Sequence, residues 1–225
     1  MPDRHDKPRI AVFDFCETIA DFQTATAFVD YTRQHSRHAS IRLRHVLFVF
    51  LVKSQLVRLF DAATGHRHST GKLLKLRELR GLTQAETERM ALQFYKERVK
   101  PHLIGPIVKE MQRLQGEGWS VGLSSGGYDV YLKHFVQDYG LDFCQCSELA
   151  FRDGRCTGKV VGKDCMRQEK VRRLNAAFGE GAGAVAYSDS SSDLPLLQWA
   201  ERGVVVSHGW HQNWIEKYHF EEIIW

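Results

Sequence analysis

The feature that most constrains this chain is a short apolar run ending in a carboxylate, IAVFDFCET, in which Ile10 to Phe13 precede Asp14. Consecutive β-forming apolar residues are typical of a strand buried on both faces of a parallel sheet. Open α/β sheets bind their ligands at the carboxyl ends of such strands. We therefore expect Asp14 to lie in a functional site at that edge.

Strand and helix signals alternate along most of the remaining sequence. The expected strands are 10–13, 119–123, 143–149, 184–187 and 204–206. The clearest helix covers 128–139, with apolar residues at helical spacing, and Ser124 to Gly127 is expected to form a tight turn. Asp153-Gly154 is typical of a β-hairpin turn. Alternation of this kind predicts a doubly wound parallel sheet.

The helical stretch 20–100 falls outside this alternation. We expect it to form an inserted all-helical cap, with 1–19 and 101–225 as the catalytic core. Within it, Thr83 to Glu86 has the spacing of a capping box, which predicts a helix from there to about Val99.

Composition excludes several classes of protein. The 225 residues, 43% hydrophobic and 26% charged, suit one globular core with a small insertion. A net charge of +4 is too small to indicate a nucleic-acid partner. The charged N-terminus does not read as a signal peptide. Five cysteines without a paired framework indicate reduced thiols, so we expect a cytoplasmic protein; the oligomeric state stays open.

Residues 36–80 are rich in Arg, Lys and His and enclose the longest apolar run, Val46 to Val52. Its seven residues are too few for a transmembrane segment. A basic segment around an apolar stripe is compatible with a helix on a membrane surface. We expect the simpler alternative, a helix buried between cap and core.

Three later segments carry side chains suited to phosphate chemistry. Ser125 with Gly126 and its neighbour offers a hydroxyl and backbone amides at a helix start, a natural phosphate cradle. Lys170 supplies a cation on an expected helix. Asp189 and Asp193, four residues apart after a strand, can hold Mg²⁺. Asp193 is also expected to cap the following helix, which has Pro195 in its first turn.

Together these segments resemble the haloacid dehalogenase-like superfamily, whose first motif is DxDx(T/V). SSGGY and the stretch ELAFRDGRCTGKVVGKDCMRQEKVRRL are similar to its phosphoserine-phosphatase-like branch. The resemblance covers nearly the whole chain. It implies a Rossmann-like core, a helical cap of the C1 type and a Mg²⁺-dependent phosphatase that forms an aspartyl-phosphate.

The resemblance also implies a role for each matching residue. Asp14 would be the nucleophile and a metal ligand, joined on the metal by Asp189 and the Cys16 carbonyl, with Asp193 supporting the metal shell. The residues expected to hold the phosphoryl group are Thr18, Ser125, Gly126 and Lys170.

Cys16 departs from the motif, because it stands where the family has an acid–base Asp. Such an acid–base group typically contributes about 10²–10⁴-fold. A thiol with a pKa near ~8.5 is a poor substitute. Three alternatives stay open: Cys16 is a weak acid in a slow phosphatase, the substrate has a good leaving group, or the phosphoryl group passes to an acceptor other than water.

Substrate preference departs from the branch as well. Gln23 lies where related phosphoserine phosphatases have a Glu that binds the substrate ammonium, so L-phosphoserine is disfavoured. Basic cap residues could meet a second anionic group, although a solvated face is the simpler interpretation for most of them: Lys72, Lys75, Arg77 and Arg80. His208 and His211 suggest a zinc site only weakly.

The sequence therefore predicts a phosphatase for a small phosphorylated metabolite. Three alternatives remain: a phosphotransferase, a lipid-phosphate phosphatase and a non-catalytic phosphate-binding regulator with the same fold.

Overall fold

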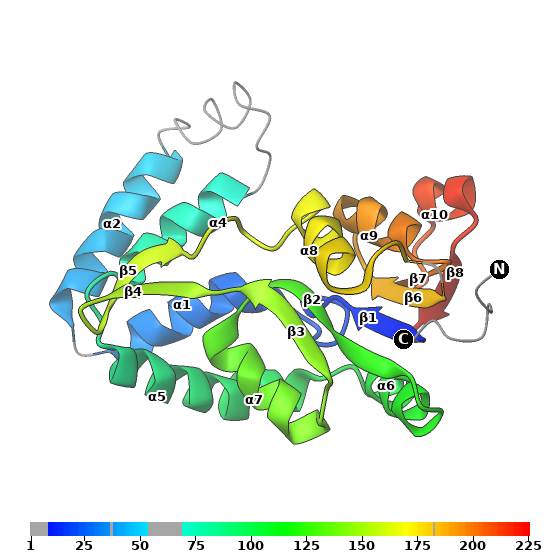
Figure 1. Cartoon of the computed structure of the whole chain (residues 1–225). Coiled ribbons are helices and arrows are strands. Elements are labelled where there is room, and N and C mark those ends of the chain that lie inside the picture. The colour runs from blue at the N-terminus through cyan, green and yellow to red at the C-terminus, as the bar shows by residue number, and fades with distance from the viewer. Residues whose placement is uncertain (1–8, 37, 54–68, 182) are drawn as a thin grey trace.

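A six-stranded sheet forms the centre of the computed structural model, which describes residues 9–36, 38–53, 69–181 and 183–225 (Figure 1). The strand order is β3-β2-β1-β6-β7-β8, and neighbouring strands run parallel. The strands are β1 (Ile10–Phe13), β2 (Ser120–Tyr128), β3 (Phe143–Ser147), β6 (Ala184–Ser188), β7 (Arg202–Ser207) and β8 (Glu221–Ile224). The predicted parallel α/β sheet is confirmed.

Helices cover both faces of this sheet, because successive strand residues point to opposite sides. Ala11 and Phe13 of β1 belong to one hydrophobic core with residues of α6 and α7. Ile10 and Val12 belong to a second core with residues of α8, α9 and α10. These helices are α6 (Gly105–Gly116), α7 (Asp129–Tyr139), α8 (Gln168–Phe178), α9 (Leu194–Trp199) and α10 (Asn213–Tyr218). The sheet is therefore doubly wound, as predicted.

The segment between β1 and β2 is helical where the structure describes it (Figure 1). Its elements are α1 (Thr24–His35), α2 (Ala39–Lys53), α4 (Ser69–Leu76), η1 (Arg77–Leu79), α5 (Gln84–Phe94), η2 (Tyr95–Val99) and η3 (Lys100–His102). Phe28 of α1 and Phe94 of α5 lie 5.4 and 5.3 Å, between ring centroids, from Tyr131 of α7. The inserted helices thus share a core with the sheet domain.

The capping box at the start of α5 is confirmed. The Glu86 amide donates to Thr83 Oγ1 at 3.2 Å, and the Thr83 amide donates to Glu86 Oε2 at 2.9 Å. The predicted helix to Val99 changes character before its end, since Tyr95–Val99 is a π-helical turn.

The predicted β-hairpin is present as β4 (Leu149–Arg152) and β5 (Arg155–Val160). Its turn residues Asp153 and Gly154 both have positive φ, 51° and 68°, as a tight hairpin turn requires. The hairpin pairs with the inserted helical segment: the Gly81 amide donates to the Cys156 carbonyl, and the Cys156 amide to Leu82, both at 2.8 Å. It is therefore tied to the helices rather than to the central sheet.

One expectation about this sheet was wrong, and one of its strands was not expected. The stretch 124–127 is not a turn, because β2 continues through it to Tyr128, with an irregular register against β3 after Ser124. The sequence also gave no expectation of α10 and β8, whose edge strand carries the exposed residues Glu221 and Glu222. An edge strand with so few buried side chains lacks the apolar pattern by which strands are found.

All five cysteines are free thiols, as expected: Cys16, Cys144, Cys146, Cys156 and Cys165. Within the described ranges, no helix is long and apolar enough to cross a membrane.

Candidate active site

Asp14 follows β1 directly and is held at the carboxyl edge of the sheet. Its amide donates to the Tyr187 carbonyl of β6 at 2.9 Å, so pairing with β6 continues one residue past the strand. Beneath it the rings of Phe13 and Tyr187 stack with centroids 4.2 Å apart. The side chain is buried. Strand pairing thus places Asp14 next to the end of β6, where Asp189 follows.

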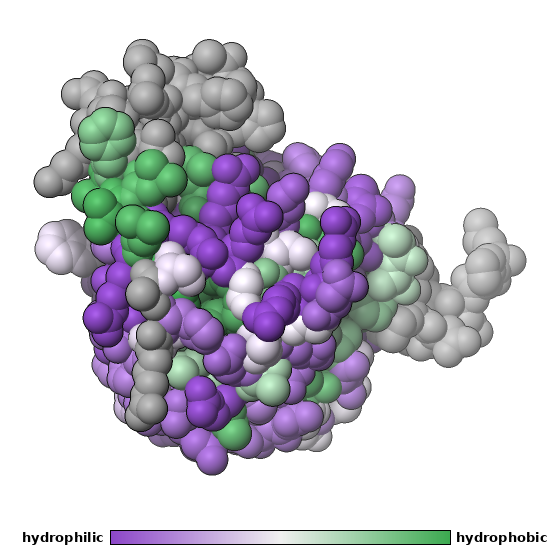
Figure 2. All heavy atoms as spheres, turned by 90° about the vertical axis from the view of Figure 1, so that its left-hand side faces the viewer, coloured by the Kyte–Doolittle hydropathy of each residue, from purple (hydrophilic) through white to green (hydrophobic). Residues whose placement is uncertain are grey.

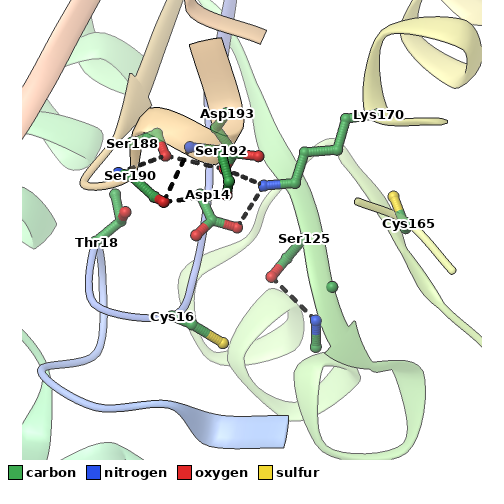
Figure 3. A network of polar contacts seen from close by, with 12 residues as sticks. Asp14, Cys16, Thr18, Ser125, Cys165, Lys170, Ser188, Ser190, Ser192 and Asp193 are labelled. Atoms are coloured by element: carbon green, nitrogen blue, oxygen red, sulfur yellow. Dashed lines mark hydrogen bonds and ion pairs between the residues drawn. The ribbon is translucent and has the colours of Figure 1, made fainter. Parts of the chain in front are cut away.

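Lys170 of α8 lies between two of the predicted carboxylates (Figure 3). Its Nζ donates to Asp14 Oδ1 at 2.7 Å and to Asp193 Oδ2 at 2.5 Å, and its side chain is 3% exposed. Burial opposes the charge, but the carboxylates of Asp14 and Asp193 raise the Lys170 pKa above its ordinary value. The ammonium group therefore stays protonated beside the proposed nucleophile.

Burial lowers the pKa of Lys170 but raises that of Asp14, because in each case it disfavours the charged form. Desolvation raises the Asp14 pKa, and the charge of Lys170 works against that shift. Removing Lys170 would leave a buried carboxyl group with no cation to keep it ionised.

Asp193 was expected to cap the next helix as well as to support the metal. Its side chain makes no capping hydrogen bond at the start of α9, so the capping expectation was wrong. The carboxylate instead accepts from Lys170 and, at 2.9 Å, from Ser188 Oγ. Pro195 does occupy the first turn, as predicted. The contacts with Lys170 and Ser188 are both to Asp193 Oδ2.

Thr18 holds Asp189 by two hydrogen bonds. Thr18 Oγ1 donates to Asp189 Oδ1 at 2.9 Å and accepts from the Asp189 amide at 3.0 Å. Burial, followed by the nearby Asp14 charge, raises the pKa of Asp189 to about 7. Thr18 is fully buried and positions Asp189; its expected contact with phosphate stays a prediction.

Cys16 lies at the end of a buried chain of hydroxyl groups. Its Sγ is 3.0 Å from Thr24 Oγ1, which is 2.9 Å from the Tyr131 hydroxyl. Burial, with a smaller effect from Asp14, raises the pKa of the Cys16 thiol to about 11. At neutral pH the thiol is therefore protonated, and no base is available at this position.

The Ser125-Gly126-Gly127 stretch lies in β2 beside these residues. Ser125 Oγ accepts from the Gly127 amide at 3.1 Å, as Figure 3 shows. A Cβ at Gly126 would lie 3.0 Å from Met166 Cγ and 3.2 Å from Lys72 Nζ. Glycine therefore leaves room for side chains from two other segments to approach the strand.

A cavity brings most of the predicted residues together. Its lining includes Asp14, Cys16, Gln23, Lys72, Gly126, Met166, Lys170, Asp189, Ser190, Ser192 and Asp193. Ser125 and Thr18 are fully buried and are not among the lining residues. Met166, Ser190 and Ser192 had no predicted role. The two serines adjoin the Asp189–Asp193 motif, whereas nothing in the sequence marks Met166.

One of the four basic cap residues reaches this cavity. Lys72 Nζ donates to the Gly126 carbonyl at 2.5 Å and to Asp164 Oδ1 at 2.6 Å, and it also lies over the ring of Tyr128. Lys75 instead pairs with Asp30 at 2.5 Å. Arg77 and Arg80 are exposed and do not line the cavity, so the expected solvated face is present for two of the four residues.

The donor set suits a hard divalent cation in one respect. Asp14 and Asp189 are close enough for the charge of one to raise the pKa of the other, a repulsion that a cation between them would relieve. Asp193 is already paired with Lys170. No cluster of three or more His, Cys, Asp or Glu side chains arranged for a metal occurs within the described residues, so these two carboxylates would need backbone or water oxygens as partners.

The suggested zinc pair in the C-terminal part is not assembled. His208 packs on Trp225 with ring centroids 4.4 Å apart, and His211 lies 3.3 Å from the Glu216 carboxylate. No group of metal-binding side chains forms around them in the described chain.

Comparison with known proteins places this site in a family. A sequence model of the haloacid dehalogenase-like hydrolases matches residues 11–198, so the chain belongs to that family. It is 36% identical over 103 residues to a phosphoserine phosphatase of Streptomyces coelicolor, covering 44% of this chain but only 24% of that relative. A phosphoserine phosphatase of Streptococcus thermophilus is 26% identical over 168 residues, 68% of this chain and 78% of the relative.

A solved structure shares the fold over nearly the full length. A protein of Bordetella pertussis Tohama I has a TM-score of 0.78 and 20% identity, covering 96% of this chain and 98% of its own. At this level of identity the likeness supports the fold alone.

Proposed function

We propose that this protein is a Mg²⁺-dependent phosphatase that hydrolyses a small phosphomonoester through an aspartyl-phosphate on Asp14. The observation that carries the proposal is the buried contact of Lys170 with Asp14 and Asp193 beside a cavity. Carboxylates from two separate segments converge on that cation, which suits an anion-transfer site better than a structural ion pair. The relatives named as phosphoserine phosphatases support the same reaction class.

In the first step an Asp14 carboxylate oxygen attacks phosphorus, and the bond from phosphorus to the ester oxygen breaks. Lys170 donates to Oδ1, and we assign the attack to Oδ2. The leaving alkoxide takes a proton from solvent or a neighbouring group. Water then hydrolyses the acyl phosphate and restores the carboxylate. Lys170 neutralises negative charge on the transferring group throughout.

The residues that would hold Mg²⁺ are Asp14, Asp189 and the Cys16 carbonyl. When bound, the ion would offset negative charge on the phosphoryl oxygens. Thr18 fixes the Asp189 carboxylate through its two hydrogen bonds. Asp193 does not contact the phosphoryl group in this proposal; it orients Lys170 by accepting a hydrogen bond from it.

Cys16 places a protonated, weakly acidic thiol where the family has its acid–base carboxylate, and we expect this to limit the rate. Since its pKa is about 11, it neither accepts a proton from water nor gives one up readily. We therefore expect rates that depend strongly on the leaving group, with aryl or acyl phosphates hydrolysed faster than alkyl phosphates.

Two cavity residues point to the rest of the substrate. Gln23 is neutral, and its amide donates to Glu17 at 2.6 Å, so it supplies no charge for an ammonium group. Lys72, which is paired with Asp164, brings a cationic side chain to the cavity lining. A phosphate ester with a second anionic group fits these two residues better than an amino-alcohol phosphate does.

The test is phosphate release by purified protein with Mg²⁺ from a panel of phosphorylated metabolites, together with mass measurement of acid-quenched peptides. Asp14→Asn should abolish release and the added phosphoryl mass on the peptide that contains position 14. Asp153→Asn, at an exposed hairpin turn that accepts Asn, is the matched control. Substantial turnover in the Asp14 variant, or a phosphoryl group on another residue, would contradict the nucleophile assignment.

A second candidate function follows from Cys16. Because no base activates water, an alcohol bound beside the phosphoenzyme would compete with water: the alcohol oxygen attacks phosphorus, the bond from phosphorus to Asp14 breaks, and the alcohol proton passes to solvent. Added glycerol would then divert product from inorganic phosphate to glycerol phosphate in proportion to its concentration. Phosphate release that glycerol leaves unchanged would favour the hydrolase.

A further inference from the structure

Helix α2 presents a stripe of large apolar side chains to solvent. Leu43, Val46, Leu47 and Phe50 are 72%, 65%, 58% and 67% exposed. Their spacing, i, i+3, i+4 and i+7, places them on one face of the helix. Figure 2 shows a hydrophobic patch on this end of the molecule, beside hydrophilic surface. The prediction that this segment is buried between cap and core was therefore wrong for these four side chains.

The orientation of α2 is fixed by polar contacts on its opposite side. His45 Nδ1 lies 3.0 Å from Glu78 Oε1, and Arg44 donates to the Glu78 carbonyl at 3.2 Å. Glu78 is 1% exposed, and Ile41 is buried nearby on the same helix. An amphipathic helix usually turns its apolar face inward. Here the polar contacts to a buried carboxylate hold the inward side, so the apolar stripe faces out.

The net charge of the sequence segment that contains this stripe favours an anionic partner. Helix α2 carries Arg42, Arg44 and Lys53 and contains no Asp or Glu. Residues 36–80 contain ten Lys and Arg against two Asp and Glu, although the whole chain has 31 against 27. Two copies meeting through this segment would bring like charges together, which disfavours self-association.

We propose that α2 is a docking surface for an anionic lipid bilayer. Leu43, Val46, Leu47 and Phe50 would enter the boundary between headgroups and acyl chains, while exposed Arg42 contacts lipid phosphate. Contiguous exposed apolar side chains of this kind mark interaction sites. Because no described helix can span a membrane, the helix would lie in the plane of the interface. The proposal concerns location and does not depend on the phosphatase activity.

Flotation of the full chain with vesicles tests this surface. The vesicles would consist of phosphatidylcholine alone or of phosphatidylcholine mixed with phosphatidylglycerol. Each would be tested at low salt and at about 0.5 M salt, which screens charge strongly. Wild type should float with the mixed vesicles, less at high salt, and poorly with phosphatidylcholine alone. Leu47→Glu combined with Phe50→Glu should reduce the partition coefficient at least about tenfold.

The matched control is Val161→Glu combined with Ile224→Glu, two exposed apolar residues outside α2. This variant should float like wild type, and both variants should keep the wild-type circular dichroism spectrum and melting temperature. Absence of flotation with mixed vesicles overturns the proposal, as does binding that the α2 variant retains in full. Concentration-dependent dimerisation that the α2 variant alone abolishes, without vesicle binding, would assign the surface to a second copy.

Discussion

Three charged side chains meet in the interior around Lys170, and burial makes their balance critical. Two carboxylates share one ammonium group, with side chains at most 9% exposed. Removing one partner of a buried ion pair commonly costs about 3–5 kcal/mol, because the remaining charge is uncompensated. Lys170 therefore opposes the effect of burial on the Asp14 pKa, and loss of any one member of this cluster should destabilise the fold.

The Cys16 thiol is the residue where substitution should improve the reaction. Cys16→Asp restores an acid–base group near the leaving oxygen, so turnover of alkyl phosphates should rise at least about tenfold. The ratio of the aryl to the alkyl turnover rate should fall. Steady-state rates on one alkyl and one aryl phosphate provide the measurement.

Cys156→Ser, at a buried thiol away from the cavity, is the control for losing a cysteine. A fall in activity of the Cys16 variant on both classes of substrate would show that the thiol has another role.

Lys72 should affect substrate binding more than chemistry. Lys72→Met removes the cation beside Gly126, so KM should rise about tenfold for substrates with a second anionic group, while kcat changes little. Lys75→Met removes a cation of the same helix that pairs with Asp30 outside the cavity, and it should leave KM unchanged. Equal effects of the two substitutions would argue against a binding role for Lys72.

At the scale of single elements, sequence motifs predicted the structure correctly where the contacts join residues close together in the chain. The capping box at Thr83 uses residues three apart, and the hairpin turn uses two adjacent residues with positive φ. Both were predictable because their hydrogen bonds close within a few residues. The end of β2 was not, because its course past Ser124 depends on the register against β3.

The capping box predicts a stability effect confined to α5. Thr83→Ala removes an accepted hydrogen bond at the helix start, at a cost of about 1 kcal/mol, and should lower the melting temperature by about 2–4 °C. Thermal unfolding followed by circular dichroism measures it. Thr26→Ala, at a half-exposed threonine inside α1, should shift the midpoint less; an equal shift would remove the cap as the cause.

At the scale of the whole molecule, the order of the strands explains why the candidate site residues of two strand ends meet. Asp14 and Asp189 both follow parallel strands, so their meeting was predictable from the order of the elements. The approach of Lys72 and Met166 was not, because each comes from a segment whose position depends on tertiary packing. The outward stripe of α2 was also missed, since the buried Glu78 that orients the helix lies 33 residues from His45.

The β4–β5 hairpin, a two-stranded ribbon, has a consequence for how a substrate would enter the cavity and a product would leave it. Backbone hydrogen bonds join the ribbon to Gly81 and Leu82, so any outward swing of the inserted helices must carry the ribbon along. The pivots of such a swing would then include the chain on either side of the ribbon, near Glu148 and Val161, in addition to the junctions of the helical insertion. Substrate entry would be a motion of two distant stretches of sequence moving as one flap, and their amides should exchange with deuterium at matching rates.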